Sequence, residues 1–208
     1  MKHVIRLAAF MIAVPAIAGA QASIITAGGS FIGPWGGAVG TPTYGQTFVT
    51  PDAVNTRLDS FTFFITPGAT GNLFGAVYQW SGTQTLGSAL FTSAAQSIAV
   101  GANTINTGGI VLDPTLQYVA FLSTEGVSDG TNNESSMGRA RDNYAGGEFV
   151  YTNGTLASNV WQYGLGDDLQ AEMQFNGAVV ATPEPASMLL LGSGLLGVYG
   201  VARRRRAG

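Results

Sequence analysis

Chemistry in the central part of this chain has to be done without histidine or cysteine side chains. The 208 residues include no cysteine and a single histidine, His3, which lies in a segment that we expect to be removed. This excludes Ser-His-Asp and Cys-His nucleophiles, zinc sites built on His or Cys, haem ligation and iron–sulfur clusters. The groups that remain are carboxylates, tyrosines, arginines and hard metal ions held by oxygen.

The densest group of oxygen ligands lies in the segment 129–134, where Asp129, Asn132 and Glu134 come close together. Because calcium takes about six to eight oxygen ligands, this segment is a candidate calcium site. Its spacing does not match an EF-hand loop, so a solvated polar loop is the favoured interpretation and no cofactor is predicted. Asp167 and Asp168 form a second acidic pair. Since neighbouring strand residues point to opposite faces, we expect this pair to mark a turn.

Aromatic side chains are the candidates for carbohydrate contact, above all Trp80, Trp161 and Tyr163. Trp161 and Tyr163 alternate, so they would share one face of a strand. Burial in the core is the favoured alternative for aromatic residues at alternate positions. A glycoside hydrolase would need two carboxylates at a defined separation across a cleft, and no motif singles out such a pair. We therefore expect the domain not to be an enzyme.

Positive charge is concentrated at the two ends of the chain. Lys2, Arg6 and Arg203 to Arg206 lie there, and only Arg57, Arg139 and Arg141 lie between them. The segment 23–181 holds eleven of the twelve acidic residues, all except Glu184, so its net charge is −8 against −3 for the whole chain. Such a segment lacks the row of phosphate contacts on which nucleic-acid binding depends. We therefore expect no nucleic-acid partner.

The N-terminus has the three parts of a secretory signal peptide. Lys2 and Arg6 precede an apolar run, Leu7 to Ala18, and small residues follow it. We predict a signal peptide over 1–22 with cleavage after Ala22, and cleavage after Ala20 is the alternative. The secretion translocon and signal peptidase are the partners that this segment implies. An uncleaved membrane anchor is the competing interpretation.

The C-terminal segment, 182–208, combines a proline-flanked acid, an apolar span and a basic end. Pro183, Glu184 and Pro185 are followed by an almost wholly apolar stretch over 186–202 and then by Arg203, Arg204, Arg205 and Arg206. A helix over 186–202 would be about 25 Å long, which is short but sufficient to cross a bilayer. The arginines would hold the chain end in the cytoplasm. The prolines would keep Glu184 in extended backbone, as a protease substrate requires.

The order of these three parts, paired with a signal peptide, resembles the PEP-CTERM sorting signal of Gram-negative bacteria. The resemblance implies recognition by an exosortase, a membrane-embedded cysteine protease or transpeptidase, with processing near Pro183 to Pro185. Proteins with this signal are typically exported by bacteria that make extracellular polysaccharide. A permanent single-span anchor with an incidental Pro-Glu-Pro stalk is the alternative.

Between the two ends, the segment 23–181 has the pattern of a β domain. Leu169–Asn176 alternates apolar and polar residues without a break, as expected of a strand with one buried face. Further apolar runs of strand length cover Leu58–Thr66, Leu73–Trp80 and Leu116–Thr124. Turn residues separate them, as at Pro67-Gly68 and Gly108-Gly109. We predict an all-β, antiparallel sandwich or jelly-roll-like domain.

Taken together, these features predict an exported protein, tethered to the inner membrane as a precursor and then released to the cell surface or extracellular matrix. A structural or polysaccharide-associated role is the leading hypothesis. A carbohydrate-binding module for extracellular polysaccharide is the alternative, and a glycoside hydrolase is the less favoured one. With so few charges to protect its strand edges, the domain is also a candidate for assembly with other chains.

Overall fold

The computed structural model describes residues 21–26, 28–127, 136–164 and 166–177, and all pairing between its strands is antiparallel. These residues belong to one compact unit. The strands are β1 (Gln21–Thr26), β2 (Ser30–Phe31), β3 (Thr43–Phe48), β4 (Arg57–Ile65), β5 (Asn72–Trp80), β6 (Thr85–Thr92), β7 (Gln96–Ser97), β8 (Gly101–Val111), β9 (Gln117–Ser123), β10 (Gly138–Arg141), β11 (Phe149–Thr152), β12 (Gln162–Tyr163), β13 (Asp167–Leu169) and β14 (Ala171–Asn176). Short 3-10 turns, η1 (Gly37–Val39) and η2 (Leu156–Ser158), lie in loops.

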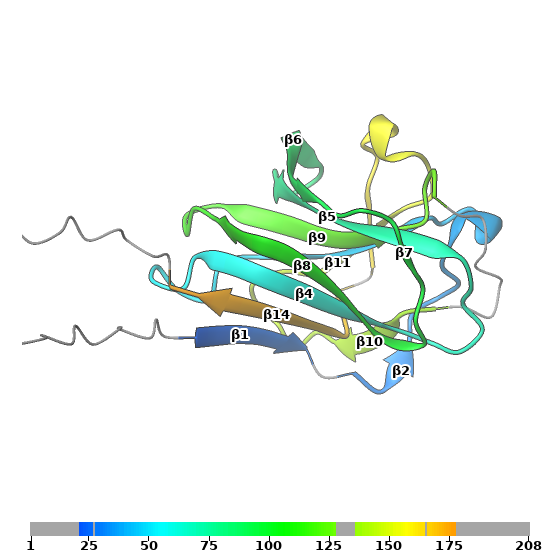
Figure 1. Cartoon of the computed structure of the whole chain (residues 1–208), viewed down its shortest axis with the longest axis horizontal. Coiled ribbons are helices and arrows are strands. Elements are labelled where there is room, and N and C mark those ends of the chain that lie inside the picture. The colour runs from blue at the N-terminus through cyan, green and yellow to red at the C-terminus, as the bar shows by residue number, and fades with distance from the viewer. Residues whose placement is uncertain (1–20, 27, 128–135, 165, 178–208) are drawn as a thin grey trace, which may run out of the picture. The chain divides into compact units, whose positions relative to one another are not determined.

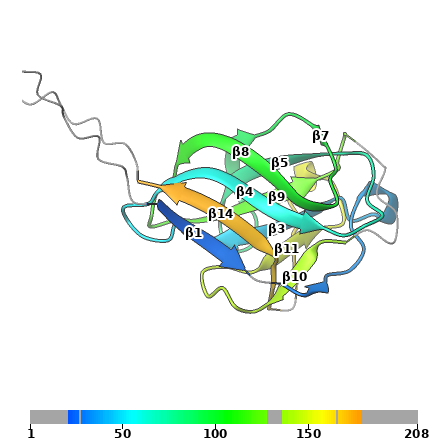
Figure 2. The same ribbon diagram turned by 60° about the horizontal axis from the view of Figure 1, so that its bottom comes forward.

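The strands form three sheets. A four-stranded sheet has the order β1-β14-β4-β8, and a seven-stranded sheet has the order β12-β11-β3-β9-β5-β6 with β7 paired to β5. A short third sheet, β13-β10-β2, lies at one end of the four-stranded sheet (Figures 1 and 2). The all-β prediction is confirmed, and the arrangement is consistent with a β-sandwich.

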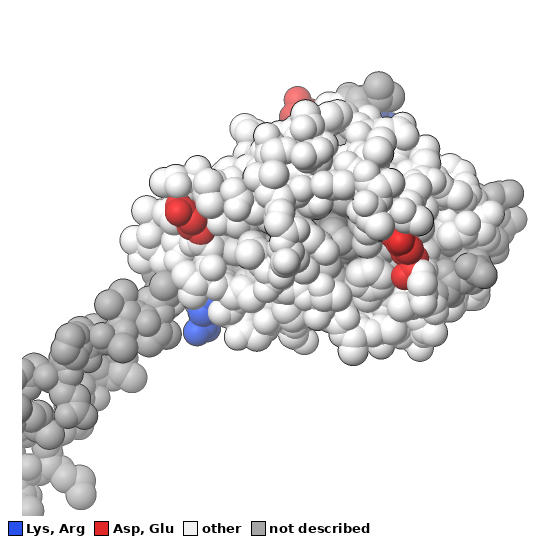
Figure 3. Space-filling view, turned by 90° about the horizontal axis from the view of Figure 1, so that it is seen from above, with Lys and Arg blue, Asp and Glu red and all other residues white. Residues whose placement is uncertain are grey.

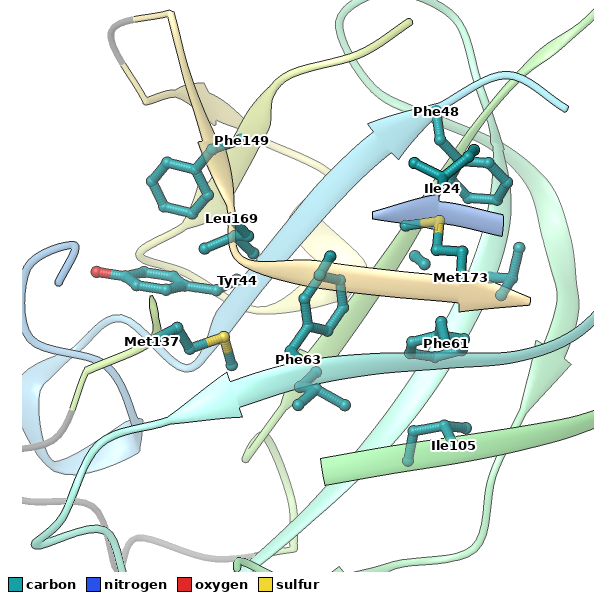
Figure 4. Close-up of a cluster of buried hydrophobic side chains, with 14 of the residues drawn as sticks. Ile24, Tyr44, Phe48, Phe61, Phe63, Ile105, Met137, Phe149, Leu169 and Met173 are labelled. Carbon is teal, nitrogen blue, oxygen red and sulfur yellow. The ribbon is translucent and has the colours of Figure 1, made fainter. Parts of the chain in front are cut away.

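The core lies between the four-stranded and seven-stranded sheets. One apolar cluster joins Ile24, Phe61 and Met173 from the first sheet to Phe48 and Tyr44 from the second (Figure 4). Aromatic side chains fill much of it, since Trp35, Phe48, Phe61, Phe63 and Phe175 are among the largest fully buried residues. Burial of this apolar surface has to stabilise the domain, because the chain has no cysteine to form a disulfide.

The strand with the clearest alternation behaves as its pattern predicts. Leu169, Ala171, Met173 and Phe175 are all at most 1% exposed, and the intervening residues are half-buried. The segment changes partners at Gln170: β13 pairs with β10, whereas β14 lies between β1 and β4. One run of alternating residues therefore contributes to both the main sandwich and the short third sheet.

Two of the predicted turns have different outcomes. Pro67 and Gly68 form a turn after β4, as predicted, with Gly68 at φ 97°. Gly108 and Gly109 instead lie within β8, where the register with β4 shifts between Leu58 and Ser60. Both glycines have positive φ, 75° and 89°, so they make a β-bulge in a continuous strand.

The chain enters and leaves the described domain at the same place. Gln21 pairs with Asn176 at one end of β1 and β14, and Thr26 pairs with Ala171 at the other end. The two antiparallel strands therefore connect the end where the chain enters and leaves with the end where β2 and β10 lie (Figure 1). The five steps from Ala171 to Asn176, at about 3.4 Å each, separate these two ends by about 17 Å.

Candidate functional site

The residues of the predicted sorting segment lie outside the described part of the chain. This applies to Pro183, Glu184 and Pro185, to the span 186–202, and to Arg203 through Arg206. Among residues 21–26, 28–127, 136–164 and 166–177, no helix is long and apolar enough to cross a membrane.

Of the two predicted signal-cleavage positions, Ala20 lies outside the described residues and Ala22 lies in β1. Gln21 and Ala22 pair with Asn176 and Phe175 of β14. Cleavage after Ala20 would keep all six residues of β1, whereas cleavage after Ala22 would remove its first two.

The predicted calcium ligands Asp129, Asn132 and Glu134 also lie outside the described residues. Glu125, just before them, uses its Oε2 to accept a hydrogen bond of 2.6 Å from the backbone N–H of Leu156. In the part of the chain that the structure describes, no group of three or more His, Asp or Glu side chains is placed to hold a metal ion.

Trp80 and Trp161 pack together on the outer face of the seven-stranded sheet. They are only 4% and 8% exposed, and their rings meet edge to face at 5.5 Å. With Ala76, Val119, Phe121 and Val150 they form an apolar cluster separate from the main core, which we call the outer cluster. Neither indole offers an open face to a sugar, so of the three predicted contact residues only Tyr163, 38% exposed, has a substantially accessible side chain.

Asn159 holds the loop over the outer cluster. Its Oδ1 accepts hydrogen bonds from the Thr85 backbone N–H at 3.1 Å, the Thr85 hydroxyl at 2.6 Å and the Trp161 indole at 3.0 Å. Its Nδ2 donates to the Thr85 carbonyl at 2.9 Å. Asn159 thus ties the loop of η2 to the start of β6.

A pocket of about 290 Å³ lies beside this loop, between Tyr78, Phe121 and Leu156, and no charged residue lines it. Figure 3, which views the molecule from the side that bears β6, likewise shows a largely uncharged surface.

A larger opening of about 400 Å³ lies between the segment around β2, the β10–β13 pair and the end of β11. We call it the aromatic groove. The side chains that matter here are Phe31, Tyr44, Phe149, Tyr151, Arg139 and Asn153. Tyr44, Phe149 and Tyr151 come from the inner face of the seven-stranded sheet, at the end covered by the short third sheet. Tyr163 also lines the groove, and its hydroxyl donates to the Gly82 carbonyl.

The rings of the aromatic groove support one another. Phe149 and Tyr151 are stacked at 5.5 Å, and Tyr44 meets them edge to face at 4.8 Å and 6.1 Å. Gly164 lines the groove as well, and a Cβ there would collide with the Phe149 ring. Tyr44 donates its hydroxyl to the Pro34 carbonyl at 2.9 Å, and burial, with a smaller contribution from Tyr151, raises its pKa to about 12. Phe31, by contrast, is 65% exposed.

Two of the three arginines in 23–181 lie beside this groove. Arg139 lines it and forms an ion pair with Asp167, and Arg139 and Arg141 together line an adjoining pocket of about 360 Å³. Arg141 is exposed and has no ion pair among the described residues. The Asp167–Asp168 pair lies in β13, so the predicted turn at this position is wrong. The two carboxylates have separate structural roles that local sequence did not reveal.

Asp168 is buried and anchors the backbone next to the arginines. Its oxygens accept hydrogen bonds from the Asn143 and Tyr144 N–H groups at 3.0 and 2.9 Å and from Gln46 Nε2 at 2.7 Å. Burial, with repulsion from Asp142, raises the pKa of Asp168 despite these hydrogen bonds. The pKa of Glu148 is also raised, chiefly by burial and then by Asp168 and Asp142. Asp168 therefore holds the loop after β10 against the sheet.

The sequence interpretation missed most of the aromatic groove. One signal was present, since Phe149 and Tyr151 alternate and so had to share a face. Phe31 gave no such signal, because β2 has only two residues and its position depends on pairing with β10.

Comparison with known proteins identifies the end of the chain. Residues 181–206 match the family model for the PEP-CTERM protein-sorting motif. This is the signal of an exported protein that is anchored transiently in the membrane and processed by an exosortase. No curated protein and no solved structure matches the chain significantly.

Proposed function

We propose that this protein is a non-catalytic component of the cell surface or extracellular matrix whose β-sandwich associates with extracellular polysaccharide. The observation that carries the proposal is the aromatic groove in a domain followed by a sorting motif. Sugar rings have apolar C–H faces and polar rims, and the groove pairs aromatic rings with amide, hydroxyl and guanidinium groups.

The sorting route would use both ends of the chain. Signal peptidase would remove the leader, and the apolar span would hold the precursor in the inner membrane with Arg203 to Arg206 in the cytoplasm. An exosortase would then act near Pro183-Glu184-Pro185, which the prolines would keep extended, and free the domain from its anchor.

The carboxylates beside the groove support binding over hydrolysis. Asp167 is paired with Arg139, and Asp168 accepts three hydrogen bonds from the protein. A glycosidase needs one carboxyl group as proton donor and a second as base or nucleophile. Both groups here are already engaged in holding the fold.

Mass spectrometry of the mature protein tests the sorting route. In cells with the exosortase, we expect a protein that ends near Pro183 to Pro185, and in cells without it the tail should be retained. A mature protein that still carries Arg203 to Arg206 in wild-type cells would establish a permanent anchor instead.

Incubation with the cell's own extracellular polymer tests the role of the domain. We expect the protein to co-sediment with the polymer and to release no new reducing ends. Release of reducing ends that stops after a single Asp or Glu substitution would replace the proposal with a hydrolase.

A further inference from the structure

We propose that the aromatic groove binds a carboxylated polysaccharide, with sugar rings against Phe31 and Tyr151 and sugar carboxylates at Arg141. The inference rests on the proposed association with polysaccharide and adds its site and its chemical class.

Phe31 is the clearest sign of a ligand in the groove. It is 65% exposed on a two-residue strand, at the rim of an opening in which Tyr44, Phe149 and Tyr151 pack against one another. Burial of a phenylalanine side chain stabilises a fold by about 1.5–3 kcal/mol, so a ring left open beside a groove lacks the stabilisation that core packing gives. An exposed apolar group rimmed by polar residues marks a binding surface.

The polar side chains of the groove suit a sugar's hydroxyl groups. Asn153 accepts a hydrogen bond of 2.9 Å from the Thr41 hydroxyl through Oδ1, and its Nδ2 has no acceptor among the residues that the structure describes. Tyr151 donates its hydroxyl to Gln162 at 3.0 Å, which fixes the outer end of the ring. The groove thus offers a fixed aromatic surface and a free amide donor next to it.

The arginines argue for an anionic ligand over a neutral one. The segment 23–181 has a net charge of −8, yet two of its three positive side chains lie here: Arg139 lines the groove, and Arg141 lines the pocket that adjoins it. Arg139 is neutralised by Asp167, whereas Arg141 is exposed and has no ion pair among the described residues. A guanidinium binds a carboxylate through two parallel hydrogen bonds, so Arg141 is matched to a uronic-acid type of group.

The groove lies away from the described ends of the chain. It lies at the end of the sandwich where β2 and β10 are found, about 17 Å along β14 from the end where the chain enters and leaves. A long polymer can therefore cross the groove without meeting the described ends of the chain.

The test measures binding of the mature, exported protein to polygalacturonate, a polymer of carboxylated sugars, and to dextran, a neutral one. We expect tighter binding to polygalacturonate, weakened by salt because exposed charges are screened. Arg141→Gln should weaken polygalacturonate binding about fivefold and leave dextran unchanged. Phe31→Ala should weaken binding about tenfold, and Phe31→Trp should restore it.

Two matched controls lie away from the groove. Arg57→Gln removes an arginine of the four-stranded sheet that is paired with Asp59 at 2.9 Å, and Tyr78→Ala opens the pocket beside the outer cluster. Neither should change polygalacturonate binding. Because Phe31 and Arg141 are exposed, their variants should fold, and a circular dichroism spectrum checks this.

Each result separates the groove from the broader function. If Phe31→Ala and Arg141→Gln leave polysaccharide binding unchanged, the groove is not the binding site, but the proposed association of the protein with polysaccharide still holds. Equal binding to polygalacturonate and dextran would overturn the proposal that the ligand is a carboxylated polysaccharide. Failure to bind these polymers and the cell's own extracellular polymer overturns the proposed function itself.

Discussion

The two faces of the seven-stranded sheet both carry aromatic side chains, but they use them differently. On the outer face, Trp80 and Trp161 are closed in by the loop that Asn159 ties to β6. On the inner face, Tyr44 and Phe149 are equally buried, yet they form the wall of a groove that ends at the exposed ring of Phe31. The difference teaches that the elements covering a face, more than the number of its aromatic residues, decide whether it can bind a ligand.

The largest expected effect is on the outer face. Trp161→Ala should lower the free energy of unfolding by about 3 kcal/mol, because it leaves a cavity against Trp80 and Phe121. Urea denaturation of the exported protein measures this. Phe31→Ala, at an exposed ring, should change stability by no more than about 0.5 kcal/mol. Equal losses for the two variants would contradict the division between a structural and a binding face.

A smaller effect is expected at the loop that closes the outer face. Asn159 has φ 49°, and its side chain makes four hydrogen bonds to Thr85 and Trp161. Asn159→Ala should cost about 2 kcal/mol, since it removes these hydrogen bonds and puts alanine in a left-handed conformation. Asn159→Gly keeps the backbone conformation accessible, so it should cost about 1 kcal/mol less in the same denaturation experiment. If the two variants lose the same stability, the backbone conformation contributes nothing.

The smallest effect concerns the inner face and appears only at high pH. Tyr44 has a pKa of about 12 in the folded protein against 10.0 ordinarily. The unfolded chain therefore releases this proton first, and stability present below pH 10 is lost as the pH rises toward 12. We expect a loss of about 1 kcal/mol, after allowance for partial screening by solvent.

Denaturant titrations at pH 9 and at pH 11 to 12 measure this loss. Tyr44→Phe should reduce the fall in the free energy of unfolding with rising pH but not abolish it. The pKa values of Tyr118 and Tyr144 are also raised by burial, so these residues contribute to the same fall. If Tyr44→Phe leaves the pH dependence of the free energy of unfolding unchanged, burial does not raise the pKa of Tyr44.

The strands with strong local patterns were predictable from the sequence. Leu58–Thr66, Leu73–Trp80 and Leu116–Thr124 were expected, and the structure has strands at Arg57–Ile65, Asn72–Trp80 and Gln117–Ser123. Their apolar side chains and the turn residues between them form patterns within a few consecutive residues. Such local patterns can be recognised from the sequence alone.

Features that depend on pairing between distant segments were not predictable in this way. Gly108 and Gly109 look like a turn locally, and only their register with β4 makes them a bulge. Asp167 and Asp168 look like a turn until β13 pairs with β10. The aromatic groove likewise needs β2, β11 and β13 to meet, and none of these strands exceeds four residues.

The position of β14 also determines when this domain can finish folding. β14 is the last strand of the domain, yet it lies between β1, the first strand, and β4. Among the described residues, β1 pairs only with β14, so on export it would stay unpaired until the last strand emerged, and only six residues separate Asn176 from Pro183. If the chain is exported from its N-terminus, the sheet would therefore be completed at about the time that the sorting motif reaches the membrane.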